Sequence, residues 1–211
     1  YTRKASSINK GQRLSFGPGN ANIQPPEERM PKYLPVQLDA ANHDIKTVYD
    51  KMEKDIGFVP NFIKTMAHSG NFLEAVANLY RSLLGETSLS EKLRQLAILK
   101  TCKIQKCKYT IICYTDLAKK MGWTDEQIEA MDDYPESELF SYYEKETLQL
   151  AELVTLEPDE IPDDFWLQLD NHFTSDQVVE LITLIGFFNM INRFIMTLDI
   201  EPDPQFSVQE Q

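Results

Sequence analysis

Cys107 is the residue whose neighbours in the sequence most favour chemistry. It lies near the start of a predicted helix and is flanked by Lys103, Lys106 and Lys108. A helix N-terminus and nearby ammonium groups both favour the thiolate, which is the reactive form of cysteine. Two interpretations stay open. Cys107 is a one-cysteine peroxidatic or sensing thiol, or it is a buried cysteine that packs as a small hydrophobic side chain.

The other two cysteines do not complete an obvious pair. Cys113 lies six positions after Cys107, about 240° further round a helix, so these thiols cannot pair within one helix. Cys102 is the better partner, because a turn over 103–106 can fold it back toward Cys107. Three cysteines in 211 residues make no disulfide framework, so we expect a reducing compartment.

No other known catalytic or metal-binding pattern is present in the sequence. The three histidines, His43, His68 and His172, are scattered without the spacing of metal ligands. There is no Ser-His-Asp order with a nucleophile elbow, and no glycine-rich phosphate loop. We therefore predict that the protein has neither a metal site nor a cofactor.

The charge is strongly negative and unevenly distributed. A net charge of -12 argues against nucleic-acid binding, which needs a basic face. The segment 123–170 is acidic, with Lys145 as its single basic residue, whereas 90–122 is rich in Lys and Arg. These segments either form solvated helix faces or meet across a subunit contact.

Helices are the elements predicted to position these residues. From residue 39 onward, apolar residues recur three and four positions apart, and no segment alternates as a strand does. The predicted helix starts are Asp39, Ser88 (with Glu91), Thr124 (with Gln127) and Thr174 (with Gln177). The predicted stops are Gly57, Gly85 and Gly122.

The most apolar stretch spans residues 178–195. Polar residues interrupt it, among them Asn192 and Arg193, which favours a buried core helix over a membrane span. A buried arginine is costly unless it is paired. We therefore expect Arg193 to pair with an acidic residue from 123–170.

Four short motifs occur in a characteristic order. They are Gly57-Phe-Val-Pro-Asn61, Leu89-Ser-Glu-Lys-Leu-Arg-Gln-Leu-Ala-Ile-Leu99, Cys107-Lys-Tyr109 followed by Ala118-Lys-Lys-Met-Gly122, and Asn192-Arg-Phe194. In this order they resemble the AhpD-like (alkylhydroperoxidase D-like) carboxymuconolactone decarboxylase superfamily, over roughly residues 55–200. The resemblance implies an all-α domain of about eight to nine helices built around a helix pair. It also implies assembly as a trimer or a multiple of trimers.

The resemblance also implies where a redox site would lie. Redox members of the superfamily carry a Glu on the first helix of the pair and Cys-x-x-Cys-x-x-x-His on the second. Position by position, Gln95 stands at the Glu, Cys107 at the first Cys, Thr110 at the second Cys and Tyr114 at the His. Gln95 takes no proton at neutral pH, and Thr110 forms no disulfide. A phenol such as Tyr114, with an ordinary pKa near 10, is a poor proton relay at pH 7.

Two functions remain open on this basis. The first is a superfamily member that has lost disulfide peroxidase chemistry and acts as a binding or assembly subunit. The second is an enzyme on the same cleft, either a lone-cysteine peroxidase using Cys107 or a cysteine-independent decarboxylase or isomerase acting on a small organic acid or lactone. A helical docking protein outside the superfamily is a third and weaker hypothesis. A small-molecule ligand fits either of the first two.

The sequence suggests three parts: an extended arm over 1–38, a helical domain over 39–200 and a tail over 201–211. The arm is rich in Gly and Pro and carries four basic residues before Glu27. We expect it to pack on a neighbouring subunit or a protein partner, and its own domain is the alternative. Its basic, acid-free start from Tyr1 also fits the remnant of an organellar or export leader, so such a location is the alternative to the cytoplasm.

Overall fold

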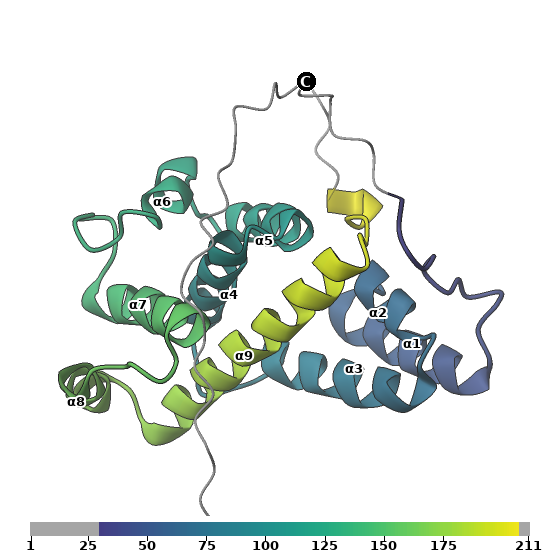
Figure 1. Ribbon diagram of the computed structural model, residues 1–211, viewed down its shortest axis with the longest axis horizontal. Coiled ribbons are helices and arrows are strands. Elements are labelled where there is room, and N and C mark those ends of the chain that lie inside the picture. Colours follow the sequence, from purple (N-terminus) through teal and green to yellow (C-terminus); the bar gives the residue numbers. More distant parts are fainter. Residues whose placement is uncertain (1–29, 207–211) are drawn as a thin grey trace, which may run out of the picture.

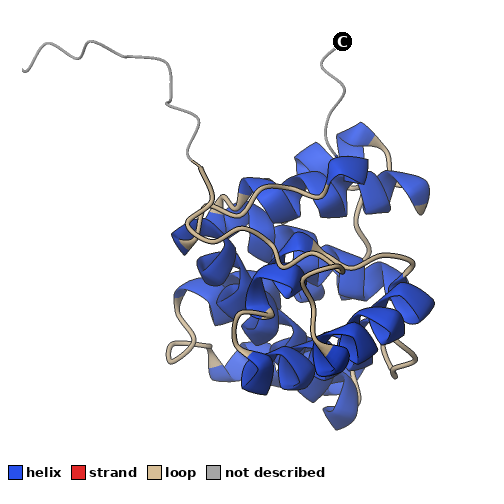
Figure 2. Cartoon of the chain, turned by 90° about the vertical axis from the view of Figure 1, so that its right-hand side faces the viewer, coloured by secondary structure: helices blue, strands red, loops and turns tan. Residues whose placement is uncertain are grey.

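Helices carry almost all the regular structure of residues 30–206, the part of the chain that the computed structural model describes (Figures 1 and 2). No strand occurs in that part, so the predicted all-α fold is confirmed. The helices are α1 (His43–Ile56), α2 (Asn61–Met66), α3 (Gly70–Leu84), α4 (Glu91–Gln105), α5 (Lys108–Lys120), α6 (Asp125–Ala130), α7 (Tyr142–Leu156), α8 (Asp163–His172), α9 (Ser175–Thr197) and the short 3-10 helix η1 (Pro204–Phe206).

Capping boxes begin α6 and α9 as the sequence predicts. The Thr124 hydroxyl accepts a hydrogen bond from the Gln127 backbone N–H at 3.1 Å, and the Gln127 side chain accepts one from the Thr124 backbone N–H at 3.1 Å. Thr174 and Gln177 repeat this exchange at the start of α9. Each box satisfies backbone donors that have no partner inside the helix.

The predicted start of α4 at Ser88 is wrong by two residues. Ser90 is the capping residue, and its hydroxyl accepts from the Leu93 backbone N–H at 3.3 Å. The Ser88 hydroxyl instead donates to the carboxylate of Glu180 on α9, at 2.9 Å. Two serines with equal capping ability stand close together, and a contact with a distant helix decides between them.

The first helix also starts later than predicted and ends where predicted. Asn42, not Asp39, caps α1 by accepting from the Ile45 backbone N–H at 3.0 Å. Gly57 ends the helix in the left-handed region at φ 86°, and its N–H donates to the Glu53 carbonyl at 2.9 Å. Glycine adopts this conformation without steric cost, which is why the stop signal is readable in the sequence.

α4 is the central helix of the domain. Residues 95–102 are buried in succession, because α5, α7 and α9 cover its faces. Even the Lys100 side chain is buried there: its ammonium group donates to the Met131 carbonyl and ion-pairs with Glu152, both at 3.2 Å, and lies 4.7 Å from the centre of the Tyr134 ring. These contacts compensate the buried charge and tie α4 to α7 and to the loop after α6.

α9 runs diagonally through the molecule, with α4 to α8 on one side and α1 to α3 on the other (Figure 1). Within residues 30–206 it is the helix whose length and composition would allow it to cross a membrane, a criterion that core helices of globular domains also meet. It packs against α3, α4 and α7. Its position agrees with the predicted core helix.

The expected pairing of Arg193 with an acidic residue of 123–170 is wrong. Arg193 is exposed, and its guanidinium donates to the backbone carbonyl of Asn189, one turn earlier on α9, at 2.8 Å. The helix is apolar on more than one side but still presents one face to solvent, and Arg193 lies on that face. The charge of Arg193 is therefore not buried and needs no acidic partner.

Both ends of the described chain lie on the helical domain. In the described part of the predicted arm, the Lys32 backbone N–H donates to the Leu198 carbonyl at 2.9 Å, and that of Val36 to the Lys64 carbonyl at 3.1 Å. Residues 1–29, on which the arm prediction mostly falls, lie outside the described residues. Of the predicted tail, residues 201–206 pack into the domain, where Phe206 is buried.

Glu144, at the start of α7, combines a helix cap with an ion pair to α4. Its carboxylate accepts from the Ser141 backbone N–H at 2.7 Å, and the Lys92 ammonium group lies 2.5 Å from its other oxygen. Burial alone would raise the pKa of Glu144, but the hydrogen bonds from Lys92 and Ser141 outweigh it and hold the pKa below its ordinary value of 4.5.

The substitution Glu144→Gln is expected to lower the free energy of unfolding at pH 7 by about 1 kcal/mol. A carboxyl whose pKa is lowered by folding stabilises the fold above its unfolded pKa and loses that contribution as the pH falls through the folded pKa. Thermal unfolding of both proteins should therefore show the full difference in Tm at pH 7 and a smaller one below pH 4.5. A difference that does not change with pH would contradict this account.

Candidate functional site

A tight turn joins the two helices that carry the predicted site. Lys106 ends α4 in the left-handed region at φ 57°, and the Cys107 backbone N–H then donates to the Cys102 carbonyl at 3.2 Å. The chain thus folds back at this point, as the sequence suggested, and α5 packs against α4. The thiols of Cys102, Cys107 and Cys113 are all free and buried.

Asn192 on α9 contacts both of these helices. Its side-chain oxygen accepts the Thr110 hydroxyl of α5 at 2.8 Å, and its amide nitrogen donates to the Cys102 sulfur of α4 at 3.6 Å. Asn192 has no solvent exposure. Thr110, at the position of the second cysteine of redox members, therefore serves as a hydrogen-bonding link between helices.

Gln95 and Tyr114 meet at the α4–α5 contact. The Gln95 amide donates to the Tyr114 backbone carbonyl at 2.6 Å, so this side chain holds the helix pair together. The Tyr114 hydroxyl lies 3.1 Å from the hydroxyl of Tyr80 on α3. Cys107 precedes the first residue of α5 and is 1% exposed.

A small cavity of about 100 Å³ lies beside this helix pair, among α2, α3, α5, α9 and η1. We call it the tyrosine cavity. Thr110 and Tyr114 line it, but Gln95 and Cys107 are not among its lining residues. The remaining polar or reactive groups in its wall are Tyr80, Tyr109, Cys113 and Asp203. Two of the four predicted site residues therefore line the cavity, together with four groups that were not predicted.

Aromatic rings fix the shape of the tyrosine cavity. Phe188 packs edge-on against Tyr114, with ring centres 5.1 Å apart. Tyr80 stacks on Phe187 at 5.7 Å and meets Phe62 edge-on at 5.3 Å. Such offset and edge-to-face contacts are the favourable arrangements for aromatic rings. The cavity wall is therefore rigid and mainly apolar.

Asp203 closes one side of the cavity from the C-terminal segment. It is 2% exposed, and its carboxylate accepts hydrogen bonds from the Tyr109 hydroxyl and from the Asn61 backbone N–H at 2.7 Å. The Asn61 side chain also holds the segment by donating to the Glu201 carbonyl at 3.2 Å. Burial raises the pKa of Asp203, although the hydrogen bonds from Tyr109 and Asn61 oppose this shift.

Burial keeps the phenols and thiols of this region protonated. It raises the pKa of Tyr80, Tyr109 and Tyr114 well above the ordinary value for tyrosine, and the Asp203 charge adds to this at Tyr109. Burial, followed by the Asp203 charge, raises the pKa of Cys113 to about 12. At neutral pH the cavity therefore offers neutral hydrogen-bond donors and a neutral thiol, and no thiolate.

Burial likewise raises the pKa of Cys102, to about 12, against the opposing hydrogen bonds from Thr110 and Asn192. Lys103, one of the three lysines near Cys107 in sequence, directs its ammonium group to the Ile128 carbonyl at 2.8 Å and to Asp132 at 2.9 Å. The ammonium group of Lys103 is therefore paired with α6 and the loop that follows it, and not with a thiol.

Sequence reasoning missed four groups of the cavity wall as site residues: Tyr80, Tyr109, Cys113 and Asp203. One signal was available: Tyr109, Cys113 and Leu117 are spaced four apart, so they lie on one face of α5. Asp203 had no comparable signal, because only the folded chain brings residues 201–206 against α2 and α5.

The histidines lie away from the tyrosine cavity. His172 contacts Glu146 at 2.7 Å, and the His68 ring nitrogen lies 2.9 Å from the Leu34 carbonyl. In residues 30–206 no three His, Cys, Asp or Glu side chains gather closely enough to hold a metal ion.

Sequence and structure comparisons agree on a family. Residues 70–132, which span α3 to α6, match the carboxymuconolactone decarboxylase family. The uncharacterized protein YdfG of Bacillus subtilis is 28% identical over 114 residues, which are 54% of this chain and 78% of YdfG.

Two solved structures share the fold over most of the chain. An uncharacterized peroxidase-related protein from Ralstonia eutropha superposes with a TM-score of 0.71 at 21% identity, covering 84% of this chain and 95% of that one. The debrominase Bmp8 superposes with a TM-score of 0.70 at 18% identity, covering 82% and 92%. The family match over α3 to α6 and this shared fold support the resemblance to the AhpD-like carboxymuconolactone decarboxylase superfamily.

Proposed function

We propose that this superfamily member binds a small ring compound in the tyrosine cavity and has lost the disulfide peroxidase chemistry of redox members. One observation carries the proposal. Beside the predicted redox position, the chain has an aromatic-walled cavity whose polar groups are three phenols, the Thr110 hydroxyl, one carboxylate and one isolated thiol. Such a mainly apolar cavity with a few placed polar groups is typical of ligand sites.

The thiol arrangement supports the loss of disulfide chemistry. A disulfide peroxidase needs a reactive thiolate and a resolving thiol within reach. Here Thr110 replaces the resolving cysteine and donates its hydroxyl to Asn192. Cys107 is buried, and it does not line the tyrosine cavity. Cys113 does line it, but with a pKa near 12 it stays a thiol at neutral pH.

Size and wall chemistry indicate the ligand class. The cavity volume of about 100 Å³ is smaller than that of an apolar cavity of about 150 Å³ that holds benzene, so it suits at most one small ring. Aromatic walls favour a planar ligand. The structural neighbour Bmp8 has been solved, as a variant, in complex with 2,3,4-tribromopyrrole, so a ring compound is a ligand class compatible with this fold.

An enzyme using the same cavity is the second candidate. The neutral phenols of Tyr80 and Tyr114 share the cavity with the Cys113 thiol, so hydrogen-bond donors would stand beside a bound ring. This favours the cysteine-independent form, a decarboxylase or isomerase acting on a small organic acid or lactone. The lone-cysteine peroxidase through Cys107 finds less support, because Cys107 lies outside the cavity wall.

Assembly as a trimer or a multiple of trimers, a partner for the N-terminal arm and a reducing compartment remain parts of this proposal. Large apolar side chains are exposed on α7, α8 and α9, among them Tyr142, Leu167 and Val179. Exposed apolar groups of this kind suit burial between subunits. The three free cysteines suit a reducing compartment.

Small ring compounds should stabilise the chain by filling the tyrosine cavity. With pyrrole, phenol or bromobenzene as probes, we expect a Kd on the order of 1 mM for the best of them, an affinity typical of ligands with so few atoms. At ten times the Kd, binding adds about 1.4 kcal/mol to the free energy of unfolding and raises the Tm. Differential scanning fluorimetry of the full chain measures this shift.

The variant Cys113→Met fills the cavity from its wall and is expected to remove the ligand-induced rise in Tm. Overpacking itself costs about 1–3 kcal/mol, so the readout is the shift with ligand and not the starting Tm. Ala75→Met, at an exposed position of α3 that does not line the cavity, is the matched control and keeps the full shift. Equal shifts in Cys113→Met and the wild type would place the binding elsewhere and refute the proposal.

Peroxide consumption with dihydrolipoamide as reductant should not exceed the rate without protein. No resolving thiol stands at Thr110, so an oxidised Cys107 would have to wait for an external thiol. A superfamily member with an intact Cys-x-x-Cys motif is the positive control. Robust turnover that Cys107→Ser abolishes would show that the lone thiol is a peroxidase centre.

A further inference from the structure

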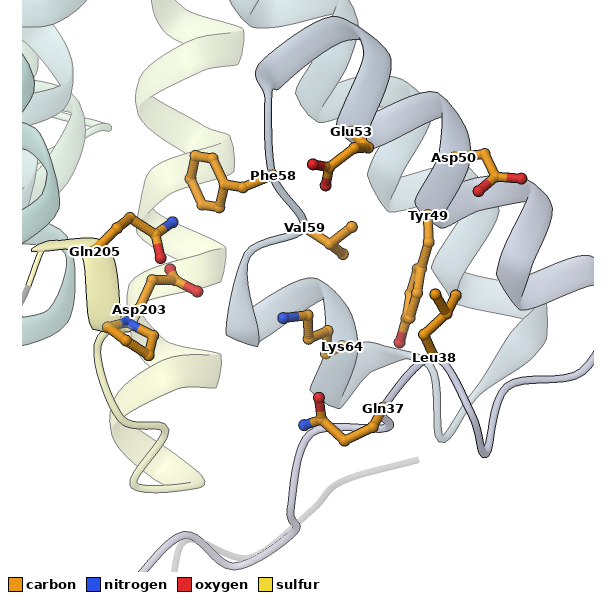
Figure 3. A pocket seen from close by; sticks show the side chains of 11 residues that line it. Gln37, Leu38, Tyr49, Asp50, Glu53, Phe58, Val59, Lys64, Asp203 and Gln205 are labelled. Atoms are coloured by element: carbon orange, nitrogen blue, oxygen red, sulfur yellow. The ribbon is translucent and has the colours of Figure 1, made fainter.

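A surface pocket adjoins the tyrosine cavity. This pocket, of about 330 Å³, lies between α1, α2, the loop before α1 and the C-terminal segment (Figure 3). Glu53 and Lys64 point into it from α1 and α2, and Asp203 stands on the opposite side. Phe58 and Asp203 line both the surface pocket and the tyrosine cavity. The two spaces therefore share a wall.

The shared wall is made by few contacts. Phe58 meets Phe206 edge-on, with ring centres 5.5 Å apart. The Phe206 backbone N–H donates to the Asp203 carbonyl at 2.9 Å, which closes the turn of η1. Asp203 is thus the ionisable group held at the boundary between the apolar cavity and the charged surface pocket.

The carboxylate of Asp203 has spare capacity to accept hydrogen bonds. Two carboxylate oxygens offer about four acceptor positions. The Asn61 backbone N–H occupies one oxygen, and the Tyr109 hydroxyl occupies the other. The backbone N–H of Asp203 itself adds a third hydrogen bond, so these donors orient the group and leave about one acceptor position. A carboxylate oriented and buried in this way is a strong acceptor for a ligand donor, because hydrogen bonds to charged groups exceed neutral ones in strength.

We propose that Asp203 is the specificity-determining residue of the tyrosine cavity and accepts a hydrogen bond from an N–H or O–H group of the bound ring. This inference rests on the proposed function and narrows its ligand class to rings that carry a donor, such as pyrroles and phenols. An anionic ring is disfavoured, because its charge would face the Asp203 carboxylate. Lys64, on the surface side, helps to keep that carboxylate ionised.

Two isomeric probes separate donor recognition from size. Both 2-methylpyrrole and N-methylpyrrole have the same heavy atoms, but only the former carries an N–H group. NMR titration of the full chain with each probe gives two Kd values. The wild type is expected to bind 2-methylpyrrole about tenfold more tightly, which corresponds to roughly 1.4 kcal/mol and is modest for a hydrogen bond to a charged group.

The variant Asp203→Asn is expected to reduce this preference to less than about threefold, because a neutral amide oxygen is a weaker acceptor than a carboxylate. Tyr109→Phe is the control at the same corner. It removes the competing phenol, leaves the carboxylate and should keep the tenfold preference or increase it. If Asp203→Asn does not fold, the wild-type preference and the Tyr109→Phe result still decide the question.

The outcomes distinguish this inference from the proposed function. A wild type that binds both isomers equally, or an Asp203→Asn variant that keeps the full preference, overturns the role of Asp203 and leaves ring binding intact. Loss of the preference in Tyr109→Phe also overturns it, because the Asn61 backbone N–H still holds the carboxylate in place there. Binding of neither isomer at about 10 mM, ten times the expected Kd, refutes the proposed function itself.

Discussion

The arrangement around the site depends on one buried amide. Asn192 joins α9 to α5 through the Thr110 hydroxyl and to α4 through the Cys102 sulfur. A polar group with no solvent exposure costs about 1–3 kcal/mol if it loses its partner, so these hydrogen bonds fix how the three helices sit against one another. Thr110, which belongs to the predicted redox site, and Cys102 thereby use their polar groups to hold helices together.

The groups that line the cavity therefore differ from those that the sequence predicted. Cys107, Thr110 and Tyr114 are spaced to share a helix face, but Cys107 lies just before the helix and is buried near the end of α4. The polar groups of α5 that line the cavity are Tyr109, Thr110, Cys113 and Tyr114, joined by Tyr80 of α3 and by Asp203. The polar groups of the cavity wall are thus mainly phenols, accompanied by one thiol, one carboxylate and the Thr110 hydroxyl.

Local signals explain what could be predicted from the sequence. The capping boxes at Thr124 and Thr174 use partners three residues away, so the sequence contains all of their information. Ser88 is different, because its hydroxyl is taken by Glu180, 92 positions later. The prediction for Arg193 was wrong for a similar reason. The face of α9 that reaches solvent depends on the packing of α3, α4 and α7 against it. Boundaries and pairings that depend on distant contacts could not be read locally.

The same limit on prediction from local signals applies to the candidate site. Gln95, Thr110 and Tyr114 lie on neighbouring helices, and their meeting follows from the helix pair that the resemblance implied. Asp203 reaches the site only because residues 201–206 return to α2 and α5, 94 positions after Tyr109. No periodicity or motif in the sequence indicates that return.

Asp203 and Glu144 are both buried carboxylates, but folding shifts their pKa values in opposite directions. Glu144 has a lowered pKa, so its ionised form stabilises the fold above pH 4.5. Asp203 has a raised pKa, so the folded chain holds its proton more tightly than the unfolded chain does. Its contribution to stability is therefore lost as the pH rises from 3.8 through its folded pKa.

An ionised Asp203 thus works against stability at neutral pH. An asparagine there would keep an oxygen to accept from the Asn61 backbone N–H or the Tyr109 hydroxyl, without the cost of a buried charge. A carboxylate that opposes folding, is oriented by two donors and lines two cavities is better explained by what it binds than by what it stabilises. The same reasoning does not apply to Asn192, whose two contacts account fully for its place in the core.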